Sequence, residues 1–338
     1  MMWLTWRQFR IQALIGYAVL AAIAVVFLAS RPGLMNLARD SGYLDCTSNC
    51  QQLGEAFIRQ AQNSHYAALY YASEFVLYGI PAVVGLFWGA PMVARELETG
   101  TYRLVWNQTV SRTRWLAFKL VFAGAATAVL AGLASLVINW WAYPIDRAQG
   151  RMIADVFAAR GVVPIGYAVF AFVAGVTVGV LIRRSIPAMV VTFAVVAAAL
   201  VASPFLLRPH LVAHDSYSAA LKADQIGSIG MRKDDTSRSI RVEAQPDLGN
   251  AWVLSTQLLD AGGKEYTGPY DPSTCGPEAR AGPDDCRKWI EAQNLTVKAD
   301  YIPATKFWAL QWREFGVFLV ASAALAIFCF WWIRRRVA

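Results

Sequence analysis

The chain has 338 residues, of which 57% are hydrophobic and only 16% are charged, and its formal net charge is +8. A soluble globular domain carries about 25% charged residues, so this composition excludes an ordinary soluble protein. The apolar residues lie in long blocks, which excludes a disordered or fibrous chain and favours a protein that crosses a membrane.

Six apolar stretches are long enough to cross a bilayer. They cover residues 12–29, 75–94, 116–138, 161–182, 186–207 and 315–333. A spanning helix needs about 20 residues, and a lone segment in hydrocarbon satisfies its backbone hydrogen bonds only as a helix. We therefore predict an all-α integral membrane protein with six transmembrane helices.

The first stretch has an alternative interpretation as a cleaved signal peptide, because basic residues precede it. Its apolar run is longer than the usual 7–15 residues or so, and the bulky segment Trp3-Leu4-Thr5-Trp6 stands before it. These features favour a first membrane span.

The basic residues predict the orientation. If the N-terminus is cytoplasmic, the inside segments hold twelve basic residues against Glu96 and Glu98, a balance of +10, while the outside segments balance to −2. Basic residues concentrate in short cytoplasmic segments, so we expect both termini inside. The positive charge then reflects membrane orientation, and a nucleic-acid partner is not expected because no soluble domain carries a basic stripe.

This topology places residues 30–74 outside as a loop and residues 208–314 outside as a small α+β extracytoplasmic domain. Strands are expected at residues 239–244 and 251–258, and a short helix at 284–293 capped by Asp284. The predicted organisation is residues 1–207 for the first five helices with a cytoplasmic segment at 95–115, the outer domain at 208–314, and the sixth helix with its basic tail at 315–338.

Four of the five cysteines lie in the predicted outer segments. Cys46 and Cys50 share the first, Cys275 and Cys286 share the second, and Cys329 falls inside a span. Two disulfides, Cys46–Cys50 and Cys275–Cys286, with Cys329 as a buried apolar residue, are the simplest arrangement in an oxidising compartment. The alternative is a four-thiolate zinc site, whose usual short paired spacings are absent here.

No chemistry-bearing motif indicates an enzyme. The i, i+4 pair His210 and His214 has no further ligand at helical spacing, so no metal is expected. The sequence contains no nucleophile–base pair of recognisable spacing and no G-x-x-x-x-G-K-[ST] phosphate-binding loop.

The segment at residues 95–115 is too long to be a simple turn between the second and third spans. It mixes apolar residues such as Leu97 and Leu104 with charged ones, which suits either an interfacial helix or a surface that docks a cytosolic partner. The acidic Glu96 and Glu98 favour docking, because anionic lipid would repel them.

Several motifs resemble type-2 ABC export permeases, especially small permeases of actinobacteria. The matching residues are Arg95-Glu-x-Glu-x-Gly-Thr, Leu104, Gln108, Ser111-Arg112 and Trp115-Leu-x-x-Lys119, the opening Trp3-Leu-Thr-Trp-Arg-Gln-Phe-Arg10, the segment Tyr301-x-Pro303-Ala-Thr-Lys306-Phe-Trp308-x-x-Gln311-x-x-Glu314, and the ending Phe330-Trp-Trp-Ile-Arg-Arg-Arg336. The family more often has Arg at the position of Lys306. The matches span most of the chain but leave the predicted outer domain uncovered.

The resemblance implies a permease that pairs with a second copy, as a homodimer, and with two separate ABC ATP-binding subunits. It also implies that the cytoplasmic segment contains the coupling helix, with the contacts to the ATPase made by Arg95, Glu96, Glu98, Gly100, Thr101, Tyr102 and Arg103. ATP and Mg are then expected in the partner subunit, with no cofactor in this chain. Transport driven by an ion gradient is less well supported. Such transporters usually carry ionisable residues inside the membrane, and the six predicted spans contain only Lys119.

Two further groups of residues are candidates for a transport role. A possible substrate path lies on or near the second span and consists of Tyr71, Glu74, Tyr78, Phe87 and Trp88. The alternative is that these aromatic residues form a belt at the membrane interface.

A possible outer gate lies at the start of the sixth span and consists of Gln311, Arg313 and Glu314. The alternative is that these residues form an ion pair or a helix cap.

Glycines at 175 and 179 in the fourth span allow close helix packing, either within the chain or in a dimer contact.

The sequence thus predicts the membrane subunit of an ABC exporter in a bacterial cytoplasmic membrane, itself not an enzyme, moving a hydrophobic or amphipathic substrate such as an antibiotic or lipid outward. The alternative is a membrane-anchored receptor or assembly protein whose extracytoplasmic domain binds a ligand.

Overall fold

The computed structural model describes residues 2–48, 50–101, 111–234, 237–266, 268, 271–275 and 282–336. The chain divides into two compact units, one formed by Met1–Leu211 with Phe307–Ala338 and the other by Val212–Lys306. The first unit is a helical bundle, and the second contains all the strands of the described residues.

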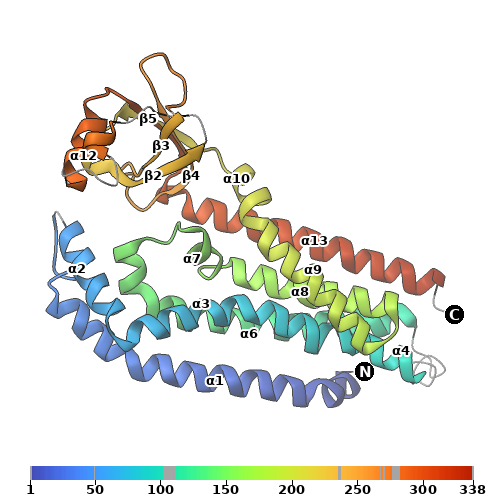
Figure 1. The fold of residues 1–338 in the computed structure, drawn as a ribbon. Coiled ribbons are helices and arrows are strands. Elements are labelled where there is room, and N and C mark those ends of the chain that lie inside the picture. The colour runs from blue at the N-terminus through green and yellow to red at the C-terminus, as the bar shows by residue number, and fades with distance from the viewer. Residues whose placement is uncertain are drawn as a thin grey trace. The chain divides into compact units, whose positions relative to one another are not determined.

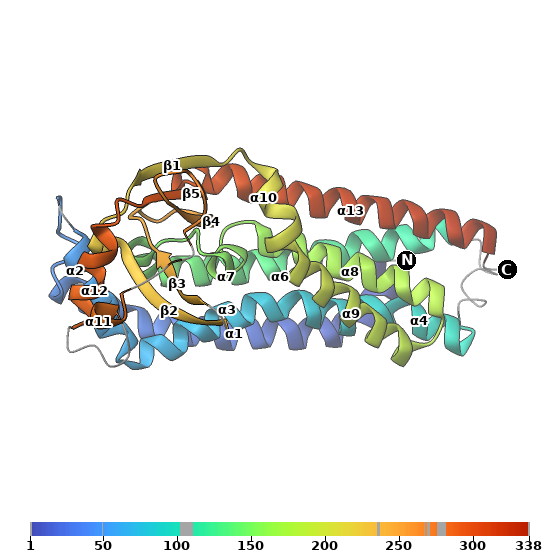
Figure 2. The same ribbon diagram turned by 45° about the horizontal axis from the view of Figure 1, so that its top comes forward.

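Six helices of the described residues are long and apolar enough to cross a membrane, which confirms the prediction of six long apolar helices. Figures 1 and 2 show them running side by side. They comprise α1 (Met2–Asp40), α3 (His65–Val83) continued by η1 (Val84–Gly89) and α4 (Ala90–Thr99), α6 (Arg112–Gln149), α8 (Val163–Ile182), α9 (Ser185–Ala202) continued by η2 (Ser203–Leu207) and α10 (Arg208–Leu211), and α13 (Phe307–Arg336), which follows η4 (Ala304–Lys306).

Most of these helices extend beyond the apolar stretches that identify them. Residues 30–74, expected to be a loop, are largely helical, since α1 continues to Asp40, α2 covers Gln51–Gln62 and α3 starts at His65. The loop prediction is wrong because polar residues outside hydrocarbon do not end a helix that still has an apolar face to bury. Leu34 and Ala38 form such a face, and both are completely buried.

Helix α8 lies at the centre of the bundle, with 72% of its apolar window buried against 11% for α1. Its glycines let other helices approach at backbone distance. A Cβ on Gly175 would lie 2.5 Å from the carbonyl oxygen of Gly85, and one on Gly179 would lie 2.6 Å from that of Ala90. The glycine pair in α8 therefore packs against η1 and α4 of the same chain.

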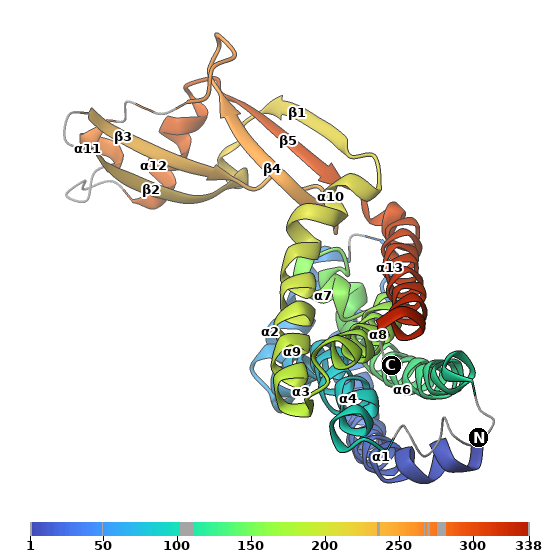
Figure 3. The same cartoon turned by 90° about the vertical axis from the view of Figure 1, so that its right-hand side faces the viewer.

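The second unit contains two small antiparallel sheets, which Figure 3 shows well. Its strands are β1 (Asp215–Ala220), β2 (Ile226–Asp234), β3 (Ser237–Ala244), β4 (Trp252–Leu259) and β5 (Thr296–Ile302), in the orders β1-β5-β4 and β2-β3. Strands β3 and β4 overlap the two predicted strands, β3 starting two residues earlier and β4 lying one residue later. The others were missed because their alternation is interrupted by polar and small residues.

Short helices complete this unit: η3 (Ala223–Gln225), α11 (Pro272–Cys275) and α12 (Pro283–Glu291). Helix α12 begins one residue earlier than predicted, with Gly282 rather than Asp284 as its N-cap. Ile290 of α12 packs in a core with Leu258, Leu295 and Val297 of the strand region.

The cysteine pairing agrees with the sequence interpretation. Cys46 and Cys50 are joined, as are Cys275 and Cys286, with Cα–Cα distances of 5.7 and 4.9 Å. Cys329 is free and buried, and its thiol donates to the Thr177 hydroxyl at 3.2 Å.

Candidate functional site

The predicted coupling segment begins on α4, which is continuous with α3 through one turn of π-helix at Val84–Gly89. Helix α4 ends at Thr99 because Gly100 adopts a left-handed conformation at φ +74°, which favours glycine. Helix α6 then starts after Ser111, whose hydroxyl accepts from the backbone N–H of Arg114 at 3.3 Å. Tyr102 and Arg103 lie outside the described residues.

Glu96 points inward from α4 towards α6. Its Oε1 lies 2.6 Å from Nζ of Lys119, which also donates to the carbonyl of Met92 at 3.1 Å. The side chain of Lys119 is 4% exposed and that of Glu96 is 12% exposed. This buried ion pair fixes α4 to the start of α6.

Glu98 connects α4 to a third helix. Its Oε2 accepts from the backbone N–H of Ser185 at 3.0 Å and from the Ser185 hydroxyl at 2.8 Å. Ser185 is the first residue of α9, so the carboxylate satisfies a free N–H group and interacts favourably with the helix dipole.

The exposed surface of α4 that is free for a partner is therefore formed by residues other than Glu96 and Glu98. Arg95, Thr99 and Thr101 are exposed, whereas Glu96 is mostly buried and Glu98 is exposed but bonded to α9. The sequence interpretation assigned both glutamates to partner contacts. The structure gives each glutamate an intramolecular role. Among the described residues of 95–101, Arg95 is the charged one whose side chain makes no ion pair or hydrogen bond.

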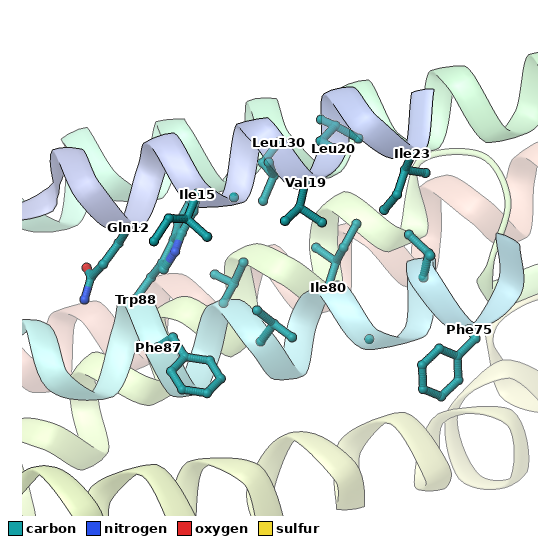
Figure 4. Close-up of a pocket in the computed structure, with 15 residues that line it drawn as sticks. Gln12, Ile15, Val19, Leu20, Ile23, Phe75, Ile80, Phe87, Trp88 and Leu130 are labelled. Atoms are coloured by element: carbon teal, nitrogen blue, oxygen red, sulfur yellow. The ribbon is translucent and has the colours of Figure 1, made fainter. Parts of the chain in front are cut away.

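Four of the five predicted path residues line two separate cavities. Tyr71 and Glu74 line a cavity of about 150 Å³, together with Asp155. Phe87 and Trp88 line another of about 480 Å³, between α1 and the α3–η1 helix (Figure 4). Tyr78 donates to the carbonyl of Asp155 at 2.7 Å. The five residues thus follow one helix but do not form a single site.

Trp88 and Glu74 differ in their surroundings. Trp88 is 4% exposed and packs edge-to-face on Phe9 of α1, with ring centroids 4.8 Å apart. Glu74 is half-buried, and its Oε1 has no hydrogen-bond partner among the described residues. An unpaired buried carboxylate oxygen is costly, which makes Glu74 a candidate for contact with water or a ligand.

The predicted gate residues form a buried hydrogen-bonded network at the start of α13. Glu314 is fully buried and accepts from Arg208 Nε at 3.0 and 3.1 Å to its two oxygens, as well as from the hydroxyls of Tyr167 and Ser203. Arg208 also donates to the carbonyl of Ala154 at 2.7 Å. The carboxylate therefore joins α13 to α8, η2 and α10.

Gln311 and Arg313 have structural partners as well. The side-chain oxygen of Gln311 accepts from the N–H groups of Val162 and Val163 at 3.0 and 3.1 Å, which caps the N-terminus of α8. Its amide nitrogen donates to Phe157 at 3.0 Å, and Arg313 donates to the carbonyl of Leu211. The ion-pair and cap interpretation accounts for all these contacts.

A third buried ion pair was missed in the sequence. Arg160 Nε lies 2.7 Å from Asp146 Oδ2, and the side chains are 0% and 4% exposed. Asp146 also accepts from the hydroxyl of Tyr70 at 2.9 Å, to which Gln149 donates at 2.9 Å. The apolar residues of 140–145 are the sequence signal that α6 continues far enough to bury this aspartate.

Comparison with known proteins identifies one family. The family described as ABC-2 membrane transporter related matches residues 17–208, which include the helices from most of α1 to the start of α10. No curated protein and no solved structure gives a significant match to the chain.

Proposed function

Because the chain belongs to the ABC-2 membrane transporter-related family, we propose that it is the membrane-spanning subunit of an ABC exporter, driven by ATP hydrolysed in separate subunits. The proposed assembly has two copies of this chain and two ATP-binding subunits in a bacterial cytoplasmic membrane, with both termini in the cytoplasm. ATP and Mg then bind to the partner, and the cargo is a hydrophobic or amphipathic compound that leaves past residues 208–314.

The observation that supports this proposal most directly is the set of contacts made by α4. This helix continues α3, is fixed to α6 by the Glu96–Lys119 pair, and is fixed to α9 by the bonds of Glu98 to Ser185. A displacement of the exposed end of α4 is therefore transmitted to three spans together. That is the mechanical property a coupling element needs.

A charge reversal on the exposed face of α4 tests the proposal. Arg95→Glu changes a surface charge without removing a buried ion pair, whereas Glu96→Lys would place two lysines together in a buried position. The control is Arg334→Glu, the same charge change at the exposed end of α13.

The measurement is co-purification with the ATP-binding subunit, together with ATP turnover of the complex. We expect a two-to-two complex from the unaltered chain and from Arg334→Glu, and a weakened or uncoupled complex from Arg95→Glu. Transport in liposomes that contain this chain and no nucleotide-hydrolysing subunit would refute the proposal. A receptor or assembly protein, the alternative function, would require no ATPase at all.

A further inference from the structure

The cavity between α1 and the α3–η1 helix is suited to an apolar ligand. Its volume of about 480 Å³ lies within the range of roughly 300–1,000 Å³ found for small-molecule sites. Figure 4 shows Val19 and Ile80 projecting into the space between the helices, with Phe75 towards one end and Gln12 at the other. Gln12 and the indole N–H of Trp88 are the polar side-chain groups among the described residues that line it.

This cavity is open on one side. Phe75 is 80% exposed and Ile15 is 60% exposed, so the apolar lining is not closed off by neighbouring helices of the chain. In a membrane that opening faces hydrocarbon or another subunit, which gives an apolar molecule a direct route of entry.

Gln12 also lines a second cavity, of about 460 Å³, whose character is different. Its lining includes Arg95, Glu96, Thr99 and Lys119. The two cavities therefore adjoin at Gln12, which lines both. One is apolar and lies along the spans, and the other is polar and lies at the end of α4.

The polar cavity carries more positive than negative charge. Arg95 and Lys119 are basic, and Glu96 is the acidic residue among the described lining, so the balance is one positive charge. Glu96 Oε1 is paired with Lys119, but its Oε2 is buried with no hydrogen-bond partner among the described residues. The cavity thus offers a cation for an acidic group and an acceptor for an O–H or N–H group.

From this succession of cavities we propose that the chain binds an amphiphile with one apolar body and an anionic head, the body lying between α1 and α3 and the head beside Arg95. Van der Waals packing against the apolar lining holds the body, since a molecule that enters from the hydrocarbon of the bilayer is not removed from water. Arg95 selects the charge of the head. This inference names the cargo class for the proposed exporter, and its role as cargo rests on that proposed function.

A cavity-filling substitution tests the apolar half. Gly79 lines the cavity, and a Cβ at this position would meet no atom within 4 Å, so Gly79→Trp can occupy the space. Gly316 on α13 is the matched control, because its Cβ would also meet open space and Gly316→Trp lies outside both cavities.

The probe is a palmitic acid that carries a photoreactive diazirine, added to the full-length chain in phosphatidylcholine nanodiscs. We expect labelled peptides from α1 and α3 in the unaltered chain. Gly79→Trp should reduce this labelling about tenfold or more, because the indole ring takes the space of the acyl chain and removes its packing contacts. Gly316→Trp should leave it unchanged. Equal labelling of the two variants would overturn the proposal.

A neutral probe tests the head. The corresponding diazirine alcohol should label more weakly than the acid, and Arg95→Gln should reduce labelling by the acid but not by the alcohol. Equal labelling by the two probes would overturn the anionic assignment. Gly79→Leu serves as a second cavity-filling variant if the melting temperature of Gly79→Trp shows that it does not fold.

These outcomes are separate from a failure of the proposed function. A chain that binds the acid but never assembles with an ATP-binding subunit would refute the exporter and retain the binding site. In the assembled transporter, loss of palmitate transport in Gly79→Trp would identify the amphiphile as cargo, whereas unchanged transport with lost labelling would identify it as a bound membrane lipid.

Discussion

Lys119 and Glu96 form a buried ion pair between α6 and α4, with 2.6 Å between Nζ and Oε1. The pair lies at the junction of the spans with the predicted coupling segment, and it connects two residues that the sequence interpretation treated separately. Its consequence is that α4 does not move independently of α6.

Removal of Lys119 alone should destabilise the protein. Lys119→Met leaves the Glu96 carboxylate buried without its partner, which costs about 3–5 kcal/mol for a buried pair. The double variant Lys119→Met/Glu96→Gln should recover most of this loss, because no uncompensated charge remains. Thermal unfolding in detergent gives the melting temperatures of the single and the double variant. Equal melting temperatures for the single and double variants would show that the charge pair is not the source of the effect.

Gly175 should not tolerate even a methyl group. A Cβ in Gly175→Ala would lie 2.5 Å from the oxygen of Gly85 and 2.8 Å from the nitrogen of Ala90, and backbone atoms cannot move aside as a side chain can. We expect a loss of about 1–3 kcal/mol in stability, typical of overpacking.

The control for this change is Gly132→Ala on α6, where the nearest atom, Ile165 Cδ1, would be 3.6 Å away in ordinary contact. It should be neutral or stabilising, because alanine is the better helix former. Melting temperatures in detergent compare the two, and a neutral Gly175→Ala would contradict the observed close approach of α8 to η1 and α4.

The proposed orientation can be tested with introduced cysteines. Thr99→Cys and Lys298→Cys place thiols at exposed positions in the two units, whereas the native Cys329 is buried. A membrane-impermeant maleimide should label Lys298→Cys in intact cells and Thr99→Cys only after the membrane is opened. Labelling of Thr99→Cys in intact cells would place α4 outside and would also exclude its coupling role.

The two disulfides should differ in their contribution to stability. Cys275–Cys286 closes a loop of 11 residues, and Cys46–Cys50 closes one of only four. In the chain-entropy account the longer loop gains more, so Cys275→Ser/Cys286→Ser should cost about 2–4 kcal/mol and expose the 212–306 unit to proteolysis.

Removal of the shorter bridge is the comparison. Cys46→Ser/Cys50→Ser should change the trypsin resistance of the 212–306 unit little, because these cysteines belong to the other unit. Limited digestion followed by mass spectrometry gives the fragments, and equal resistance of the 212–306 unit in both double variants would contradict the prediction.

The number of membrane spans could be predicted from the sequence because it depends on local composition. A backbone in hydrocarbon must satisfy its own hydrogen bonds, so any apolar stretch of sufficient length becomes a helix whatever surrounds it. The cysteine pairing was predictable for a similar reason, since each pair lies close in the chain. Helix ends were less predictable, as residues 30–40 show, because they depend on packing against other helices.

The tertiary structure alone decided which charged groups meet. Glu96 pairs with Lys119, Arg208 with Glu314 and Arg160 with Asp146, and none of these pairings follows from charge, periodicity or a motif. The sequence by itself determined how many helices are long and apolar enough to cross a membrane, and it contains the residues of 95–119 that resemble the family. The faces that these helices present to one another, and so the partners of Glu96 and Glu314, were decided only when the helices packed, because a buried charge must find its counter-charge among whatever residues the fold brings within reach.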